Sequence, residues 1–297
     1  MIKKRNVSSC ISLFFIPIFY KSAIMKIERK GSFLMKTFIK KSAVLFLTIG
    51  ALALTGCSSG GDANNDSSAI AYNQTRMSHY DVVKREAKPT IDGVTDDEIW
   101  AEVPAISGGF HLPWEDKEAP LTVFKAYHDD ENMYFSFEVT DEDVLVAKED
   151  TDDENVVDGE DRVEIFIAGK YIDVPGPKGM EPYYGIEIDP KGRVHDYSII
   201  YYRDFDGKWN LDGLETKATQ NDKGYVVEGL IPMKFLRDNK LINENNVMNA
   251  GVYRAEFSTP KKEGEDPIMS WISWIDPKTE NPDYHVASSF GEFRFLK

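Results

Sequence analysis

The chain contains 297 residues, with 50 acidic and 35 basic side chains and a formal net charge of −15. Hydrophobic residues make up 42% and charged residues 29%, a composition typical of a folded globular protein. The charge is uneven: residues 1–56 carry ten Lys or Arg and one Glu, which leaves 25 basic and 49 acidic residues from Cys57 onward. The excess of acidic residues from Cys57 onward argues against nucleic acid or an anionic membrane surface as a partner, because both require a cationic face on the protein.

The N-terminal region contains a secretory signal pattern that begins at Met35. Three lysines lie within residues 36–41, and an apolar run follows over residues 43–54. The run is too short to cross ~30 Å of hydrocarbon as a helix, which favours a signal peptide over a membrane span. Residues 1–34 hold a second basic and apolar stretch, interrupted by Pro17. Because two tandem signals serve no purpose, we interpret residues 1–34 as an upstream extension and Met35 as the true start; a tandem anchor is the alternative.

The signal ends in Leu54-Thr-Gly-Cys57. This ending resembles a bacterial lipobox, which implies that residues 35–56 are removed and that Cys57 is lipidated. An ordinary secretory signal with a coincidental cysteine is the alternative. The residue after the cysteine is Ser58 rather than Asp, which in lipoproteins favours the outer membrane. Residues 57–81 are then the lipidated cysteine and a tether rich in small and polar residues. The membrane is expected as a partner through this anchor only.

From about Val82 onward the pattern is that of β-strands. Apolar and polar side chains alternate through residues 133–140, and Asp189-Pro-Lys-Gly192 between two such runs predicts a hairpin. Helices are predicted only at 95–103, with Thr95 as the cap, and at 232–237. Further strands are predicted at 121–128, 162–167, 183–189, 193–203, 225–231, 252–258, 268–274 and 292–296. The pattern over residues 82–297 therefore predicts one all-β domain. We expect a single antiparallel, jelly-roll-like β-sandwich with one or two short helices. The cysteines, Cys10 and Cys57, both precede it, so its stability depends on an apolar core.

No pattern for nucleophilic or zinc chemistry is found in the sequence. The five histidines are isolated, and neither a nucleophile elbow nor a phosphate-binding loop occurs. An acidic segment over residues 141–161 offers hard oxygen ligands that suit Ca²⁺, although a solvated acidic loop is the interpretation that the residues alone favour. The candidate calcium ligands are Asp141, Asp143, Asp152 and Asp153.

Carboxylates also occur inside predicted strands, between apolar neighbours. These residues are Glu164, Glu187, Glu228 and Glu256. They either lie on a solvated face of the sheet or form a hydrogen-bonding face, with Arg162 or another arginine opposite and a ligand between. A carboxylate pair could also hydrolyse a glycosidic bond, which is the enzymatic alternative.

Several aromatic residues lie in loops or near strand ends, where a flat ring with a polar edge could stack on a sugar. Core packing is the alternative for each of them, and we assign Trp100 to the core. The candidate aromatic ligand residues are Trp114, Tyr184, Trp209, Trp271 and Trp274.

Several segments together resemble family 9-like carbohydrate-binding modules. They occur in order from Lys88 to Phe295: Pro89-Thr-Ile-Asp-Gly-Val-Thr-Asp-Asp-Glu-Ile-Trp100, the hairpin 122–140, Asp161-Arg-Val-Glu-Ile-Phe-Ile167, Gly224–Pro232 and Phe290-Gly-Glu-Phe-Arg-Phe295. The resemblance implies a non-catalytic β-sandwich that binds an oligo- or polysaccharide between two aromatic rings, with calcium in a structural role. One ring would be Trp271 or Trp274, and the other Trp114, Tyr184 or Trp209, with Arg162, Glu164 and Glu187 as polar partners. The same sandwich occurs in haem-binding domains of the dopamine-monooxygenase N-terminal type, for which Met269 and His285 would be the axial ligands.

Overall fold

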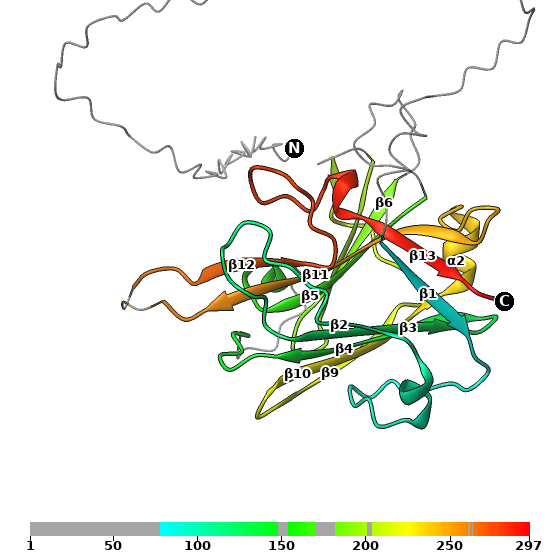
Figure 1. Cartoon of the computed structure of the whole chain (residues 1–297), viewed down its shortest axis with the longest axis horizontal. Coiled ribbons are helices and arrows are strands. Elements are labelled where there is room, and N and C mark those ends of the chain that lie inside the picture. Colours follow the sequence, from blue (N-terminus) through cyan, green and yellow to red (C-terminus); the bar gives the residue numbers. More distant parts are fainter. Residues whose placement is uncertain (1–77, 148–153, 170–181, 201–203, 261, 263) are drawn as a thin grey trace, which may run out of the picture. The chain divides into compact units, whose positions relative to one another are not determined.

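A computed structural model describes residues 78–147, 154–169, 182–200, 204–260, 262 and 264–297 (Figure 1). The predicted segments 1–34 and 35–56, Cys57, almost all of the 57–81 tether, and Asp152 and Asp153 lie outside these residues. No helix in the described part of the chain is long and apolar enough to span a membrane.

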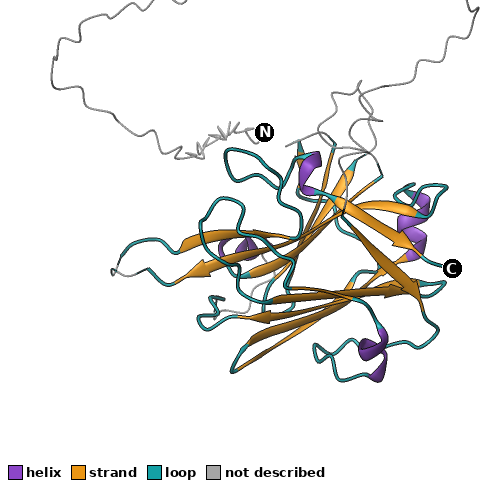
Figure 2. Ribbon diagram, in the orientation of Figure 1, coloured by secondary structure: helices purple, strands orange, loops and turns teal. Residues whose placement is uncertain are grey.

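The strands form a strongly curled sheet that folds into two layers (Figures 1 and 2). The first layer contains β8 (Phe205–Asp206), β7 (Val194–Ile199), β6 (Tyr183–Ile188), β5 (Arg162–Ala168), β11 (Val247–Ser258), β12 (Ile268–Ser273) and β13 (Gly291–Phe295). The second contains β2 (Ala105–Ser107), β3 (Thr122–His128), β4 (Asn132–Thr140), β10 (Gly224–Pro232) and β9 (Glu215–Asn221). The predicted all-β fold is confirmed.

The first strand, β1 (His79–Lys84), connects the two layers. It pairs in parallel with β13 on one side and with β3 on the other, whereas the other strand pairs of the described residues are antiparallel. The chain therefore enters the sandwich at the seam between the layers. The sequence predicted a purely antiparallel sandwich because a hairpin leaves a turn signal, whereas a parallel pair between chain ends leaves none.

Short helices occupy the edges: η1 (Glu98–Glu102), η2 (Glu154–Gly159), α2 (Met233–Asp238) and η3 (Ala287–Ser289). Both predicted helices are present, but the predicted cap at Thr95 is wrong. Asp97 is the N-cap residue of η1, and the Thr95 hydroxyl donates to Glu138 instead.

Three apolar clusters account for the nearly continuous burial of strands such as β5. The largest lies between the layers and includes Phe124, Phe137, Ile165 and Val252. A second covers the outer face of the β5–β6–β7–β11 layer, where the segment 284–290 packs on Phe166 and its neighbours. The third covers the outer face of the other layer beneath η1. Each of the two layers is therefore buried on its inner face and on part of its outer face.

Glu228 on β10 anchors the loop that precedes η1. Its Oε2 accepts hydrogen bonds from the backbone N–H groups of residues 92, 93 and 94 at 3.2, 2.9 and 3.1 Å. Its Oε1 accepts one from Trp100 Nε1 at 2.7 Å. Gly93 has φ +86° and lies against the backbone of Ala218, so a side chain does not fit there. This explains the Ile-Asp-Gly…Trp segment and confirms Trp100 as a core residue.

Candidate ligand-binding pocket

A pocket of about 350 Å³ opens on the outer face of the β5–β6–β7 sheet, next to the short edge strand β8. Its lining combines buried charges with aromatic rings from several elements. The lining residues are Asn155, Asp158, Arg162, Glu187, His195, Tyr197, Phe205, Gly207 and His285. A larger hollow of about 610 Å³ lies along the loop 108–122, but its charged side chains are exposed or half-buried. Because binding sites concentrate perturbed, convergent polar groups, the smaller pocket is the candidate site.

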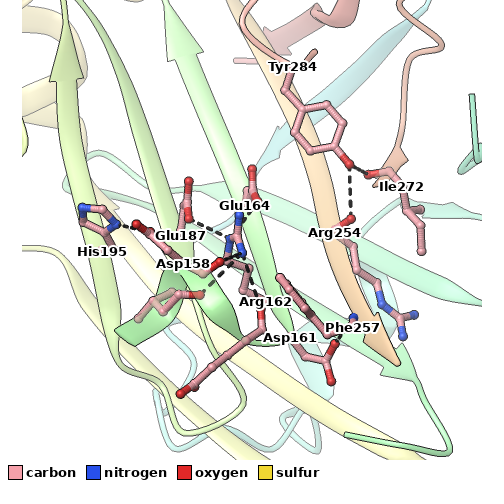
Figure 3. Close-up of polar contacts among 12 residues, drawn as sticks. Asp158, Asp161, Arg162, Glu164, Glu187, His195, Arg254, Phe257, Ile272 and Tyr284 are labelled. Atoms are coloured by element: carbon pink, nitrogen blue, oxygen red, sulfur yellow. Dashed lines mark hydrogen bonds and ion pairs between the residues drawn. The ribbon is translucent and has the colours of Figure 1, made fainter. Parts of the chain in front are cut away.

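Arg162, Glu164 and Glu187 form a buried ionic cluster at the floor of this pocket (Figure 3). Glu164 on β5 lies directly opposite Glu187 on β6 in the antiparallel register. Arg162 Nε lies 2.9 Å from Glu164 Oε1 and 2.7 Å from Glu187 Oε2. The alternative of a solvated face is therefore wrong for these carboxylates, and the expected grouping with Arg162 is present.

Burial raises the pKa of both carboxyl groups. The pKa of Glu164 is raised to about 8, chiefly by loss of solvent and further by the charge of Glu187, while Arg162 opposes the shift. Burial also raises the pKa of Glu187, opposed by Arg162 and by the hydrogen bond from Tyr197. The pocket floor thus takes up a proton readily near neutral pH.

Asp158 and His195 form the polar rim of the pocket. Asp158 lies within η2 and is exposed, whereas His195 on β7 is half-buried. Their Oδ1 and Nδ1 atoms lie 2.6 Å apart, and this contact raises the pKa of His195. His195 lies directly opposite Glu187 in the β6–β7 register, so the rim and the floor are continuous.

Aromatic rings form the wall opposite the charges. Phe205 on β8 is 44% exposed, and its ring centroid lies 5.4 Å from that of Tyr197 and 5.1 Å from that of His285. His285 in turn stacks on Phe166 at 5.0 Å. An exposed ring held by buried ones is a rigid apolar surface next to hydrogen-bonding groups.

The predicted pair of Trp114 and Trp271 lies at the other end of this aromatic cluster. Both are half-buried, with ring centroids 6.4 Å apart, and both contact Tyr284. Trp114 Nε1 donates to the carbonyl of Thr279 at 3.0 Å. Neither tryptophan lines the pocket.

Three other predicted aromatic residues pack toward the core. Trp274 is 7% exposed and contacts Phe293 between the sheets. Tyr184 is 4% exposed on the inner face of β6, and Trp209 packs on it at 4.5 Å. For Trp274 and Tyr184 the prediction of a ligand-facing ring is wrong. Trp209 keeps some exposure but lies against the core side of the sheet.

The calcium ligands predicted from the sequence are only partly brought together. One carboxylate oxygen each of Asp141, Asp161 and Glu256 lies within 4.8 Å of the other two. Asp143 instead accepts hydrogen bonds from the N–H and the hydroxyl group of Thr259. Asp141 Oδ2 is buried and accepts no hydrogen bond within the described residues, and Arg254 Nη2 lies 3.7 Å from it. Three carboxylates against one guanidinium leave excess negative charge on hard oxygen atoms, so these residues fit Ca²⁺.

The two residues considered as haem ligands are far apart. Met269 lies opposite Phe257 of β11, whereas His285 stacks on Phe166, which lies opposite Gly251. Six residues along a strand correspond to roughly 20 Å. One iron ion therefore cannot bind both side chains.

Sequence reasoning missed Asp158, His195, Tyr197, Phe205 and His285 as pocket residues. For His195 a usable signal was present. The predicted turn at 189–192 closes a hairpin whose register places residue 195 opposite Glu187, as observed. Phe205 and His285 come from a two-residue strand and a loop, and their approach to the pocket depends on long-range packing.

Comparisons with known proteins support this fold. The model of the family described as carbohydrate family 9 binding domain-like matches residues 91–297. The crystal structure of a candidate carbohydrate-binding protein from Bacteroides uniformis aligns with a TM-score of 0.53 and 16% identity, covering 73% of this chain and 99% of that chain. A family 9 module from Caldicellulosiruptor kristjanssonii, solved with cellotriose, aligns with a TM-score of 0.48 and 19% identity over 73% of this chain and 93% of that chain. No curated protein matches the chain.

Proposed function

The chain belongs to the carbohydrate family 9 binding domain-like family, and from this premise we propose that it binds an oligo- or polysaccharide in the pocket on the outer face of β5–β7, without catalysing a reaction. The observation that carries the proposal is the meeting of a buried Arg–Glu cluster with an exposed aromatic ring in one pocket of about 350 Å³. Sugars present apolar C–H faces and polar hydroxyl edges, and this lining offers a surface for each.

In the proposed complex the apolar face of a sugar ring lies against Phe205 and His285. Its hydroxyl groups hydrogen-bond to Asp158 and His195 at the rim and to Glu187 at the floor. Hydrogen bonds to charged partners contribute more than neutral ones, about 1.5–3 kcal/mol each. Because the sheet holds the floor residues in fixed positions, little ordering is needed when the ligand binds.

Replacing the exposed ring tests this proposal. Phe205→Ala should weaken binding of an oligosaccharide ligand about tenfold, as measured by calorimetry after a glycan-array search, because a stacked aromatic ring contributes on the order of 1 kcal/mol. The matched control is Leu121→Ala, which removes an equally exposed apolar side chain in the other hollow. Equal affinity in both variants, or no glycan binding at all, would contradict the proposal. Release of reducing sugar from polysaccharides would contradict the non-catalytic role.

We further propose that Ca²⁺ binds at Asp141, Asp161 and Glu256 and stabilises the domain. The ion would offset the repulsion between these carboxylates, which lie at the ends of β4 and β11 and at the start of β5. None of these three residues lines the pocket. Removing Ca²⁺ with a chelator should lower the melting temperature, and Glu256→Gln should abolish that response; an unchanged melting temperature on chelation would refute it.

We also propose that the mature protein is an outer-membrane lipoprotein anchored through Cys57. The lipobox-like ending of the predicted signal supports this. The mature chain should incorporate a radiolabelled fatty acid and fractionate with the outer membrane, and Cys57→Ala should abolish both. Release of an unlipidated wild-type protein would refute the anchor.

A further inference from the structure

Three side chains of metal-binding type converge between the rim and the floor of the pocket from three separate elements. Asp158 belongs to η2, Glu187 to β6 and His195 to β7. One ligand atom of each lies within 4.8 Å of the other two. Figure 3 shows the side chains of His195, Asp158 and Glu187 next to one another beside Arg162.

One oxygen of Glu187 has a free lone pair although the residue is only 6% exposed. Its Oε1 accepts a hydrogen bond from Tyr197 at 2.7 Å. Its Oε2 lies 2.7 Å from Arg162 Nε, but the single hydrogen of that nitrogen is donated to Glu164. Within the described residues Glu187 Oε2 therefore accepts no hydrogen bond. A buried acceptor without a donor is costly, and a cation would use that lone pair.

The charges of the cluster are not balanced. Asp158, Glu164 and Glu187 bring three negative charges, and Arg162 brings one positive charge that lies between two of them. With all three carboxyl groups ionised and a neutral imidazole the sum is −2, which one divalent cation neutralises.

The donor set selects the type of cation. Imidazole nitrogen and carboxylate oxygen are both zinc ligands, and three protein ligands leave one coordination position open. At metal–ligand distances of ~2.0–2.2 Å, tetrahedral ligands lie roughly 3.4 Å apart. The present ligand atoms lie within 4.8 Å of one another, so their separations need to change by at most about 1.4 Å to reach this spacing. The exposed Asp158 side chain can rotate to take part in this adjustment.

We propose that Asp158, Glu187 and His195 bind a divalent transition-metal ion, best matched by Zn²⁺, with its open coordination position facing the pocket. This site is separate from the proposed calcium cluster. It shares its three side chains with the proposed sugar contacts, and the metal titrations are therefore carried out without sugar.

Calorimetric titration of the purified, chelator-treated protein with ZnCl₂ tests the site. One saturable site is expected, and Asp158→Asn and His195→Ala should each weaken it at least tenfold. His111→Ala, which removes an exposed histidine from the other hollow, should leave it unchanged. Asp158 is exposed, so its substitution leaves the fold intact, which circular dichroism verifies.

A titration with CoCl₂ provides an independent readout of the ligands. The visible bands of four-coordinate Co²⁺ should appear with the unaltered protein and with His111→Ala, and should be lost with His195→Ala. The proposal is overturned if no saturable binding occurs, or if Asp158→Asn and His195→Ala bind Zn²⁺ as the unaltered protein does. Sugar binding measured in the presence of a chelator reports on the proposed function separately.

Discussion

Glu228 and Glu187 occupy similar positions in the two halves of the sandwich but have opposite surroundings. Each is a buried carboxylate within a strand, between apolar neighbours. Glu228 receives four hydrogen bonds from the loop 92–94 and Trp100. Glu187 receives one from Tyr197 and an ionic contact from Arg162, and it lies at a pocket. The number of donors that the protein itself supplies separates a structural carboxylate from one that is available to a ligand.

The largest effect is expected at Glu228. Glu228→Ala leaves four donors without their partner, and two of them, the Gly93 N–H and Trp100 Nε1, are buried. Each buried donor that loses its partner costs about 1–3 kcal/mol. We therefore expect the free energy of unfolding to fall by at least about 3 kcal/mol in urea denaturation. Glu215→Ala on the edge strand β9 is exposed and should change it by less than about 0.5 kcal/mol. Equal stability of the two variants would remove the distinction between the two glutamates.

The converse result is expected at Glu187. Glu187→Gln retains the shape of the side chain and leaves Arg162 paired with Glu164, so the free energy of unfolding should change by less than about 1.5 kcal/mol. Sugar affinity should fall about tenfold or more, because an amide cannot form charge-assisted hydrogen bonds. Calorimetry and urea denaturation on the same preparation separate the two effects. A variant that unfolds as readily as Glu228→Ala would assign Glu187 to the structural class.

A smaller effect concerns pH. Glu164 has a pKa of about 8 in the folded state against 4.5 for a solvent-exposed glutamate, as in the unfolded chain, so between these pH values the folded state holds more protons than the unfolded state. Stability should therefore be fully present below about pH 4.5 and decrease as the pH rises toward 8. Glu164→Gln should flatten this decrease by on the order of 1 kcal/mol or more, measured by thermal or urea denaturation from pH 5 to 8.5. An unaltered slope in the variant would show that the Glu164 carboxyl does not carry the excess proton.

The parts of the fold and of the pocket that can be predicted from the sequence are those set by contacts between residues close together in the chain. Alternation and turn residues predict strands such as β4 and β5 within about one residue, because those signals are local. The polar strand β9, Glu215–Asn221, has no apolar alternation and was not predicted, since it forms by pairing with β10. The grouping of Arg162 with Glu164 and Glu187 was predictable from strand positions. The wall formed by Phe205 was not, because it depends on a two-residue strand at the sheet edge.

Trp271 was also predicted from the sequence as a ligand-binding ring, but it does not line the pocket. Its substitution is expected to have the smallest effect on sugar affinity. Its ring is half-buried and lies against Tyr284, at the far end of the aromatic cluster from the pocket. Trp271→Ala should therefore change sugar affinity by less than about twofold, against about tenfold for Phe205→Ala, in the same calorimetric measurement. Comparable losses in both variants would mean that the ligand extends from the pocket across β5 and β11 to β12. Since neighbouring strands are ~4.8 Å apart, such a ligand would have to contain several sugar units, and affinity would then rise with chain length in the unaltered protein but not in Trp271→Ala.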